Sequence, residues 1–546
     1  MTTTDESTSP PPTMLQRLRR MGLLATVFVC AACGLVYELA LITLGSYLVG
    51  NTASQAAIVL SVMVFAMGIG ALMAKPLQKR PAFSFAMIEL ALALLGGLSV
   101  LILYAAFSWL HMYTVALVVV AFLIGLLVGA EIPLLMELLQ RIRKQSAGSA
   151  TSDLFAADYI GGLIGGLAFP FLLLPVFGQI RGAILVGAIN AIAGLILIFA
   201  VFHADLRKMV KIGLGSVAIT VTVVLALAYI HTDRFEAAAR QALYAHPIVY
   251  SDDTSYQQIV LTESISSFGE SDLRLFLNGD LQFSSIDEYR YHEALVHPAM
   301  DGTRDNVLVL GGGDGLGVRE ILRYDDVESV TLVDLDPAVT ELASNFDPLV
   351  ELNDGALNHP KVTVINEDAF NWLRANPERF DVIIADLPDP DKSATAKLYS
   401  VEFYALARQL LEPEGRISIQ SGSPYFAPNS FWTIHATVIE AGFAPRPYWV
   451  SVPSFGDWGF LQADLSDEKP ELSIDADEID SPLQSMTEAS LNAAMVLPPD
   501  RDFREKDPST LMNPHILQHA QREWRSYLDS SSRINSRNFN HHALFL

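Results

Sequence analysis

Cysteine is nearly absent from this chain of 546 residues, which contains only Cys30 and Cys33, both in an apolar run near the N-terminus. The C-terminal part therefore has neither a disulfide framework nor a thiolate zinc site, and its sequence shows no compact histidine and cysteine cluster that would predict a metal. Charged residues are also scarce, at 18% against 51% hydrophobic residues. This balance excludes a disordered protein and disfavours a wholly soluble one, and the length predicts two or three domains.

Positive charge is scarce in the C-terminal part. Residues 1–230 carry 13 Lys and Arg against 9 Asp and Glu, a net charge of +4, whereas the remainder carries 23 against 51, a net charge of −28. Such an acidic region should repel nucleic acid and suit a cationic partner, although solubility alone would also explain the charge.

Long apolar runs fill the N-terminal half, which we predict to be a helical transmembrane domain over residues 22–230. A bilayer-spanning helix needs about 20 mostly apolar residues. Seven stretches are long enough: roughly 22–50, 54–74, 84–110, 112–136, 154–178, 181–203 and 212–230. The first is too long for a cleavable signal peptide. The segment before it predicts a disordered basic tail over residues 1–21.

Basic residues alternate between the predicted loops. Twelve lie at the N-terminus and in the second, fourth and sixth loops, the fourth with Arg143 and Lys144, while the other short loops contain only Arg181. The positive-inside rule then predicts a multi-pass protein of the cell membrane with a cytoplasmic N-terminus. Seven spans would place the C-terminal part outside the cytoplasm, whereas a re-entrant turn in the first stretch would reverse that placement.

Carboxylates inside the predicted spans are a second feature of this half. Glu38, Glu131 and Asp158 are candidate intramembrane functional sites, and protonation or a bond to a neighbouring helix is the equally acceptable structural alternative. Glu89 lies nearer a span end and is predicted to be interfacial. The glycines at 161, 162, 165 and 166 predict a close approach of two helices.

The sequence of the C-terminal half predicts an α/β fold. Short alternating strands over 248–285, with the hairpin dipeptide Asn278-Gly279, predict a small β subdomain that, with a connector, covers residues 231–299. A buried strand, a glycine turn and a helix follow, and they predict a Rossmann-like, methyltransferase-type doubly wound sheet over residues 300–465. Residues 466–546 are predicted to be an acidic linker followed by helices that contain Trp524.

Acids gather where the successive strands of this predicted sheet end. The glycine turn consists of Gly311, Gly312, Gly313 and Gly315 and encloses Asp314; the later strands end at Asp334 and Asp336, at Asp368, and at Asp386 and Asp389. Ligands of open α/β sheets bind at this edge, and an acid at the end of the second strand normally holds a ribose diol. We therefore predict a nucleoside site there.

Asp314 argues against the common ligands of such a turn. Its carboxylate would repel the pyrophosphate of NAD or ATP, and it is awkward beside the carboxylate of S-adenosylmethionine, which disfavours a methyltransferase. A ligand that ends in a bare ammonium would be attracted, and decarboxylated S-adenosylmethionine is such a ligand.

These motifs resemble the spermidine synthase (polyamine aminopropyltransferase) family, and in particular its long bacterial members with an N-terminal multi-span membrane domain. The resemblance covers most of residues 22–465. It is carried by DLFAADYIGGLIGGLAFPFLLLP (153–175), YQQIVL (256–261), LNGDLQFSSIDEYRYHE (277–293), LGGGDGLGVREIL (310–322), VTLVDLD (330–336), INEDAF (365–370), DVIIADLPDPDKSATAKLYS (381–400), QSGSPYFA (420–427) and VPSFGDWGF (452–460).

The resemblance implies a role for each matching position. Gln257 and Asp334 would contact the ribose, Asp368 the adenine amino group and Asp314 the aminopropyl ammonium. Tyr291 and His292 would line the cleft, Asp386 would be the general base, and Asp389 would help to bind the acceptor amine. It also implies decarboxylated S-adenosylmethionine as co-substrate, with no metal and no further cofactor.

The chemistry agrees with a base at Asp386. A primary ammonium with a pKa near 10.4 is not a nucleophile at neutral pH, so a carboxylate must accept its proton. Paired acids assist because their repulsion raises one pKa. Structural ion pairs are the alternative reading of these acids. A membrane transporter or sensor that binds a polyamine or adenosyl ligand without turnover is the alternative function, and a homo-oligomeric state is left open.

The sequence departs from the family pattern mainly near the acceptor amine. Asp334 replaces the usual glutamate, which shortens the reach to the ribose by one methylene. The loop after Asp389 reads DKSATAKLY, and Phe455 stands in place of an acceptor-site tyrosine. The acceptor is therefore less defined by the resemblance than the nucleoside is.

Overall fold

In the computed structural model the chain forms two compact units, Met1–Ala245 and His246–Leu546, which we describe separately. The structure describes residues 14–49, 52–142, 147–202, 206–265, 269, 271–475, 478–479 and 481–523. Residues 1–13 of the predicted tail, the loop residues Arg143 and Lys144, and Trp524 lie outside these ranges.

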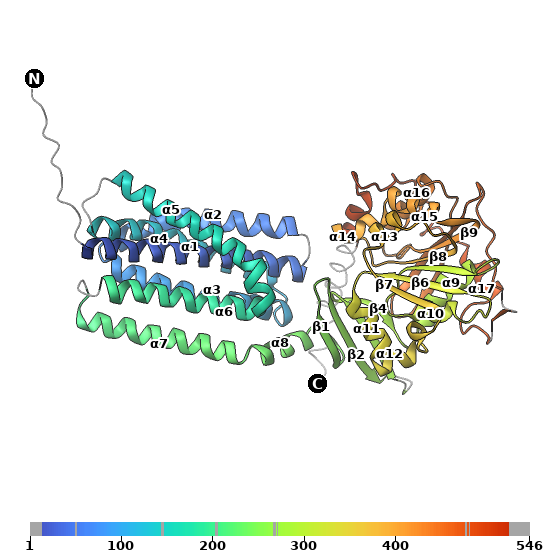
Figure 1. Cartoon of the computed structure of the whole chain (residues 1–546), viewed down its shortest axis with the longest axis horizontal. Coiled ribbons are helices and arrows are strands. Elements are labelled where there is room, and N and C mark those ends of the chain that lie inside the picture. The colour runs from blue at the N-terminus through green and yellow to red at the C-terminus, as the bar shows by residue number, and fades with distance from the viewer. Residues whose placement is uncertain are drawn as a thin grey trace, which may run out of the picture. The chain divides into compact units, whose positions relative to one another are not determined.

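The first unit is built of helices (Figure 1). Its long helices are α1 (Met14–Val49), α2 (Thr52–Leu77), α3 (Pro81–Ser108), α4 (Tyr113–Ile142), α5 (Ala147–Ala168), α6 (Leu174–Ile196) and α7 (Lys208–Ile230), followed by the short α8 (Thr232–Gln241). Residues 14–21, which we expected in a disordered tail, belong to α1. Leu, Gln and Arg are good helix formers, and Arg20 pairs with Asp153 on α5, so the helix continues beyond its apolar run.

Six helices of the described chain are long and apolar enough to cross a membrane. One of them, Thr151–Val201, has 51 residues, which at 1.5 Å per residue is roughly 77 Å and more than twice a bilayer core. It is interrupted at Gly178, whose φ of 69° and ψ of 179° are not helical. Gly178 lies near the start of α6, and α5 and the main part of α6 run in opposite directions (Figure 1). The seven predicted apolar stretches thus correspond to α1–α7.

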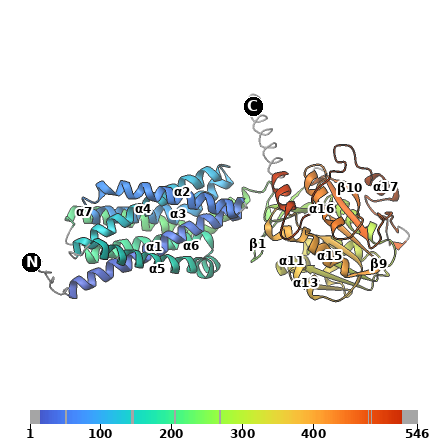
Figure 2. The same cartoon turned by 90° about the horizontal axis from the view of Figure 1, so that it is seen from above.

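Glycines bring α5 close to α1, as the sequence predicts. A Cβ atom at Gly161 would lie 2.2 Å from the carbonyl oxygen of Phe28, and one at Gly165 would lie 2.4 Å from that of Ala32. The other two glycines of the stretch face the side chain of Leu35 less tightly, at 3.9 and 3.0 Å. α1 packs along both α5 and α6, and Figure 2 shows the three helices together.

The second unit begins with a four-stranded antiparallel sheet of order β1-β2-β3-β4. Its strands are β1 (Ile248–Asp253), β2 (Gln258–Ile265), β3 (Ser271–Leu277) and β4 (Asp280–Ser284). Asn278 and Gly279 join the last two strands with φ angles of 54° and 88°. Two positive φ angles are the signature of the type I′ hairpin turn, so the predicted hairpin is confirmed.

A seven-stranded sheet of order β10-β11-β9-β8-β5-β6-β7 follows. Its strands are β5 (Asn306–Gly311), β6 (Ser329–Asp334), β7 (Val362–Asn366), β8 (Phe380–Asp386), β9 (Leu411–Gln420), β10 (Arg446–Val452) and β11 (Gly456–Asp464). β5 to β9 pair in parallel, and β10 and β11 are antiparallel. The strand order reverses between β5 and β8, and such a switch point is where open α/β sheets bind ligands.

Short helices surround this sheet: α9 (Glu288–Val296), α10 (Leu316–Ile321), α11 (Pro337–Asn345), α12 (Asp347–Leu352), α13 (Ala369–Ala375), α14 (Ser393–Ala396), α15 (Val401–Gln409), α16 (Pro428–Glu440) and α17 (Glu488–Ala494). Apolar residues of the parallel strands are buried against these helices. Runs of Val, Leu and Ile are typical of strands that are covered on both faces. The mixed sheet with flanking helices is the Rossmann-like architecture expected from the sequence.

The C-terminal segment is fixed to the second unit by two carboxylates. Glu293 on α9 is fully buried and accepts the backbone N–H groups of residues 484–486. Glu523, in a helical segment over 515–523, accepts the N–H groups of Asn429 and Ser430 in the first turn of α16. Much of the predicted acidic linker is therefore ordered against the sheet domain rather than extended.

Candidate active site

The glycine turn after β5 lies directly against the end of β8. Gly311 has a φ of 80°, and a Cβ atom there would lie 2.0 Å from the carbonyl oxygen of Asp386. Gly312 donates its N–H to that same oxygen at 3.1 Å. Only glycine permits this conformation and this approach, so the turn holds Asp386 at the switch point.

Asp334 is held at the end of β6 by two backbone donors. Its Oδ2 atom accepts the N–H of Gly313 at 3.1 Å, and its Oδ1 atom accepts the N–H of Asp336 at 3.0 Å. Burial raises the pKa of this carboxyl to about 6, the charge of Asp314 adds to the rise, and the two N–H donors oppose it. Asp334, the residue predicted to contact the ribose, is therefore fixed beside the glycine turn.

Gln257 lies in the β1–β2 turn, which Thr254 ties to the end of β6. The Thr254 hydroxyl donates to Oδ2 of Asp336 at 2.7 Å, and it accepts the N–H of Gln257 at 3.0 Å. This connection ties the turn that contains Gln257 to the end of the strand that carries Asp334. Sequence reasoning missed Thr254, although a threonine that opens a tight turn is the available signal.

Asp314 is 9% exposed inside the glycine turn, where its Oδ1 atom accepts the N–H of Leu316 at 2.9 Å. Burial raises the pKa of this carboxyl, whereas the positive charge of His292 opposes the rise. The turn thus presents a buried acid where nucleotide sites present N–H groups to phosphate, which is the feature that the sequence singles out.

His292 is held in its charged form by Glu288. Its Nδ1 atom donates to Oε2 of Glu288 at 2.7 Å, and Arg319 donates to both carboxylate oxygens of Glu288 at 2.9 and 3.0 Å. Burial opposes protonation of His292, but the hydrogen bond and the charge of Glu288 raise its pKa to about 9. An imidazolium therefore balances part of the negative charge of the site. Sequence reasoning missed Glu288, which lies one turn before His292 on α9, and Arg319, which lies on α10.

Asp386 accepts a hydrogen bond from the hydroxyl of Tyr291 at 2.5 Å. Burial raises the pKa of this carboxyl to about 6, and the charge of Asp314 adds to the rise, while His292 and the Tyr291 hydroxyl oppose it. A carboxylate with a raised pKa is a better proton acceptor than a free aspartate and is still ionised at pH 7.

Asp389 lies in the loop after β8, whose backbone is fixed by buried polar side chains. Tyr399 donates its hydroxyl to the carbonyl oxygen of Leu387 at 3.1 Å, and Gln420 donates its amide to that hydroxyl at 2.6 Å. Burial raises the pKa of Asp389 to about 7, the charges of Asp391 and then Asp280 add to the rise, and Gln420 and Lys392 oppose it. Gln420 and Asp280 were not among the predicted site residues.

Asp368 follows β7, at the sheet edge where the sequence predicts it. Its Oδ1 atom accepts the N–H of Asn371 and caps α13 at 3.0 Å, and its Oδ2 atom accepts from Nζ of Lys397 at 2.6 Å. Both carboxylate oxygens therefore already have partners. An adenine amino group would therefore either share the Asp368 carboxylate with Lys397 or displace Lys397 from it.

Aromatic side chains form one wall beside Tyr291. The ring of Phe455 lies 6.2 Å from that of Tyr291 and 5.3 Å from that of Trp458. Nε1 of Trp458 is buried without a hydrogen-bond partner among the described residues. Phe455 thus lies near the predicted base, where the sequence places the acceptor end of the site.

The intramembrane candidates do not form a single group. Glu38 and Asp158 are half-buried, and Asp158 lines a small pocket beside Phe155. Glu131 is buried together with Glu89. Glu89, which we predicted to be interfacial, is fully buried in the bundle, where Asn190 donates to its carboxylate at 2.7 Å.

Comparisons with known proteins agree with the motifs. The spermine/spermidine synthase domain matches residues 288–475. The chain is 54% identical to polyamine aminopropyltransferase 1 of Streptomyces coelicolor over 519 residues, which are 95% of this chain and 97% of that protein. The chain belongs to the polyamine aminopropyltransferase family. The predicted family, in its long bacterial form, is thereby confirmed, and the relative's coverage includes the helical unit.

Two further members of the family are similar to this chain. The polyamine aminopropyltransferase of Mycobacterium tuberculosis strain H37Rv is 45% identical over 515 residues, covering 92% of this chain and 97% of its own length. A spermidine synthase crystallised with the transition-state analogue AdoDATO is 25% identical, covering 46% of this chain and 85% of its own, with a TM-score of 0.42.

Proposed function

We propose that this protein is a membrane-bound polyamine aminopropyltransferase. It moves the aminopropyl group of decarboxylated S-adenosylmethionine to an amine such as putrescine, giving spermidine and methylthioadenosine. The observation that carries the proposal is the buried Asp314 inside the glycine turn, adjacent to the Tyr291–Asp386 hydrogen bond. Membership of the family supports it independently.

The co-substrate would lie along the carboxyl ends of the parallel strands. Asp334 and Gln257 would hold the ribose, and Asp368 the adenine amino group. Asp314 would attract the aminopropyl ammonium, since a buried anion favours a cation over the carboxylate of S-adenosylmethionine. Asp314 is only 9% exposed, so water screens its charge little, which supports this selection.

The reaction is a displacement at the methylene carbon beside the sulfonium. The acceptor nitrogen forms a new C–N bond, the C–S bond breaks, and its electron pair neutralises the sulfur of methylthioadenosine. The acceptor must first lose a proton, which Asp386 accepts. An ammonium pKa near 10.4 against about 6 for Asp386 leaves a gap of roughly 4 units, or about 6 kcal/mol, that desolvation of the ammonium must reduce.

Asp389 would bind the acceptor, together with the acidic group Asp280. The aromatic wall of Tyr291, Phe455 and Trp458 supplies an apolar surface for the methylene chain of a polyamine. Alternating acids and apolar surface are the features that a flexible di-cation requires.

Amine-dependent turnover tests the proposal. Purified full-length protein is incubated with decarboxylated S-adenosylmethionine and a panel of diamines and polyamines, and methylthioadenosine is measured. We expect release that depends on both substrates. Tight binding of the nucleoside with no turnover for any amine would instead support a membrane sensor or transporter, because a binding protein needs no base beside the amine.

We infer further that the helical unit crosses the membrane seven times from a cytoplasmic N-terminus. The concentration of basic residues in alternate loops supports this orientation. The break in the helix at Gly178 supports counting α5 and α6 as two spans. The catalytic unit would then lie outside the cytoplasm and would need its substrates delivered. Reporter fusions at residue 240 test this: active alkaline phosphatase is expected, and a fluorescent cytoplasmic reporter would reverse the assignment.

A further inference from the structure

Three side chains capable of binding a metal meet inside the helical unit. Sγ of Cys30 on α1 and one carboxylate oxygen each of Glu89 on α3 and Glu131 on α4 all lie within 4.8 Å of one another. Their exposed fractions are 2%, 0% and 5%. Three separate helices thus bring one thiol and two carboxyl groups to a single buried point.

This cluster has fewer donors than it has acceptor atoms. Oε1 of Glu89 and Oε1 of Glu131 are buried and have no hydrogen-bond partner among the described residues. Asn190 on α6 donates its Nδ2 to Oε2 of Glu89 at 2.7 Å, and its own Oδ1 is buried without a partner in the described part of the chain. The Cys30 thiol also hydrogen-bonds to Glu89, and the carboxyl groups of Glu89 and Glu131 hydrogen-bond to each other. Two carboxylates are costly in an apolar bundle, so the cluster must hold a proton or a metal cation.

Helix α6 leaves room for this arrangement. A Cβ atom at Gly194, one turn beyond Asn190, would lie 2.8 Å from Cβ and 2.9 Å from Cγ of Glu89. Glycine therefore allows the Glu89 side chain to pass α6, and the Asn190 amide orients the carboxylate. An oriented carboxylate is what a metal ligand requires from the groups around it.

We propose that Cys30, Glu89 and Glu131 bind a thiophilic divalent cation, of which Zn²⁺ is the best match. Mixed sulfur and carboxylate ligands suit zinc, whereas Mg²⁺ and Ca²⁺ prefer oxygen alone. A divalent cation also offsets both carboxylates, which a shared proton does not. Three protein ligands leave a fourth tetrahedral position for water.

Binding requires a small contraction of the cluster. Zinc bonds of about 2.3 Å to sulfur and 2.0–2.2 Å to oxygen put tetrahedral ligand atoms roughly 3.3–3.8 Å apart, against the present limit of 4.8 Å. The Cys30 thiol loses its proton on binding, so affinity should rise with pH.

Cobalt titration of the full-length protein tests the site. The protein in detergent is stripped with a chelator and titrated with Co²⁺, which reports thiolate ligation by a near-ultraviolet charge-transfer band. We expect one equivalent per chain, displaced by Zn²⁺. Cys30→Ser should lose the band, and Asn190→Ala should weaken binding by roughly 10–100-fold, the usual effect of a group that orients a ligand.

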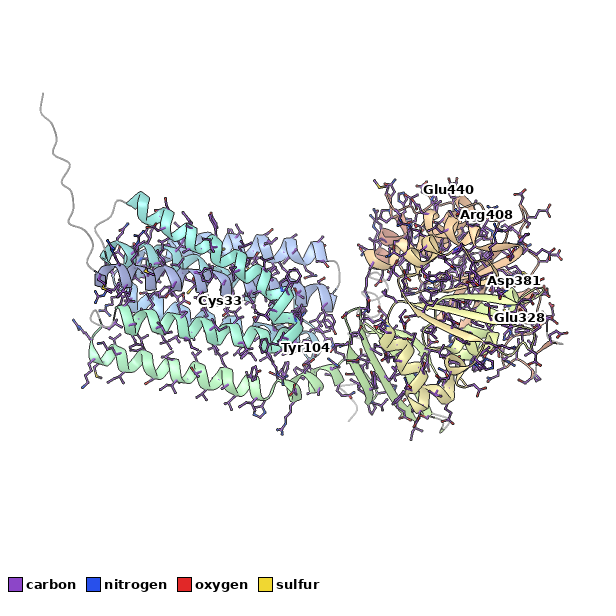
Figure 3. All side chains as sticks on the ribbon, in the orientation of Figure 1. Cys33, Tyr104, Glu328, Asp381, Arg408 and Glu440 are labelled. Atoms are coloured by element: carbon purple, nitrogen blue, oxygen red, sulfur yellow. The ribbon has the colours of Figure 1, made fainter. Side chains whose placement is uncertain are left out.

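Cys33→Ser is the matched control. Cys33, labelled in Figure 3, is on the same helix, but its Sγ points to the carbonyl oxygen of Val186 at 3.8 Å. It should bind cobalt as the wild type does. Glu89→Gln and Glu131→Gln are nearly isosteric and should lower affinity more than Asn190→Ala. Methylthioadenosine release and thermal unfolding in each preparation show whether a variant has folded.

Two results would overturn the site. Absence of stoichiometric cobalt binding by folded wild-type protein would mean that the carboxyl groups share a proton instead. An unchanged charge-transfer band in folded Cys30→Ser would place the metal elsewhere.

Discussion

The two units treat buried carboxylates in opposite ways. At the sheet edge, Asp334 accepts two backbone N–H groups and Asp386 accepts the hydroxyl of Tyr291. In the helical unit, Glu89 accepts one amide, and one oxygen of Glu131 has no partner among the described residues. Turns and helix starts supply free N–H groups, whereas a helix interior has already used its own. An acid inside a span must therefore find a side chain, a proton or a metal.

The largest predicted effect is at Asp386. Asp386→Asn keeps the shape of the side chain but removes the base, so turnover should fall by roughly 10²–10⁴ with little change in nucleoside affinity. Methylthioadenosine release measures the first quantity and equilibrium binding the second. Asp381→Asn is the control on the same strand, because Asp381, labelled in Figure 3, bonds the N–H of Asn306 instead. Near-normal turnover in Asp386→Asn would refute the base assignment.

The second effect concerns the charge of the glycine turn. Asp314→Asn should weaken decarboxylated S-adenosylmethionine by roughly 10–100-fold, the loss expected for one charge-assisted contact of about 1.5–3 kcal/mol. S-adenosylmethionine should lose much less affinity, because its own carboxylate gains from removal of the anion. Titration calorimetry with both ligands compares the two losses. Equal losses would show that Asp314 does not select the ammonium.

A third, smaller effect isolates the helical unit. In Gly165→Ala the new Cβ would lie 2.4 Å from the carbonyl oxygen of Ala32, so α1 and α5 must separate. Overpacking of this kind costs about 1–3 kcal/mol, and the thermal unfolding temperature should drop. Gly162→Ala is the control, since its Cβ meets only Leu35 at 3.9 Å. Turnover per folded molecule should be unchanged in both variants, and a selective loss of turnover in Gly165→Ala would couple this packing to catalysis.

The sequence predicts the site well where its geometry is local. The glycine turn and the acids at the strand ends follow from short segments, because parallel strands bring their carboxyl ends to one edge. Backbone donors close in sequence fix Asp314 and Asp334, but the hydroxyl of Tyr291 reaches Asp386 over 95 positions, and other bonds that fix this unit are as distant. Thr254 reaches Asp336 over 82 positions, and the bond between Glu293 and the Ser485 hydroxyl spans 192. No local pattern encodes such pairings.

In the helical unit the apolar stretches were predictable, and the burial of the acids among the helices was not. Hydropathy locates each helix, but burial depends on which face meets another helix. Glu89 is near the start of its stretch, yet it is fully buried because α6 offers Asn190 as a donor and Gly194 as space. The charged start of α1 was likewise missed, because its arginines extend the helix instead of ending it.

The smallest predicted effect is a shift in the pH profile. Asp386 must be ionised to accept a proton, and its pKa is about 6, so turnover should fall as the pH drops through that value. The Tyr291 hydroxyl donates to the carboxylate and stabilises its ionised form, which lowers this pKa. Tyr291→Phe removes the donor, so the pKa rises and the acidic limb of the profile should move to higher pH by up to about one unit. Tyr404→Phe is the control, because the Tyr404 hydroxyl is buried without a partner among the described residues. A shift to lower pH in Tyr291→Phe, or an equal shift in Tyr404→Phe, would contradict a direct bond from Tyr291 to the base. An unchanged limb would assign the titration to another group, of which Asp334, with a pKa of about 6, and Asp389, with a pKa of about 7, are the nearest in value.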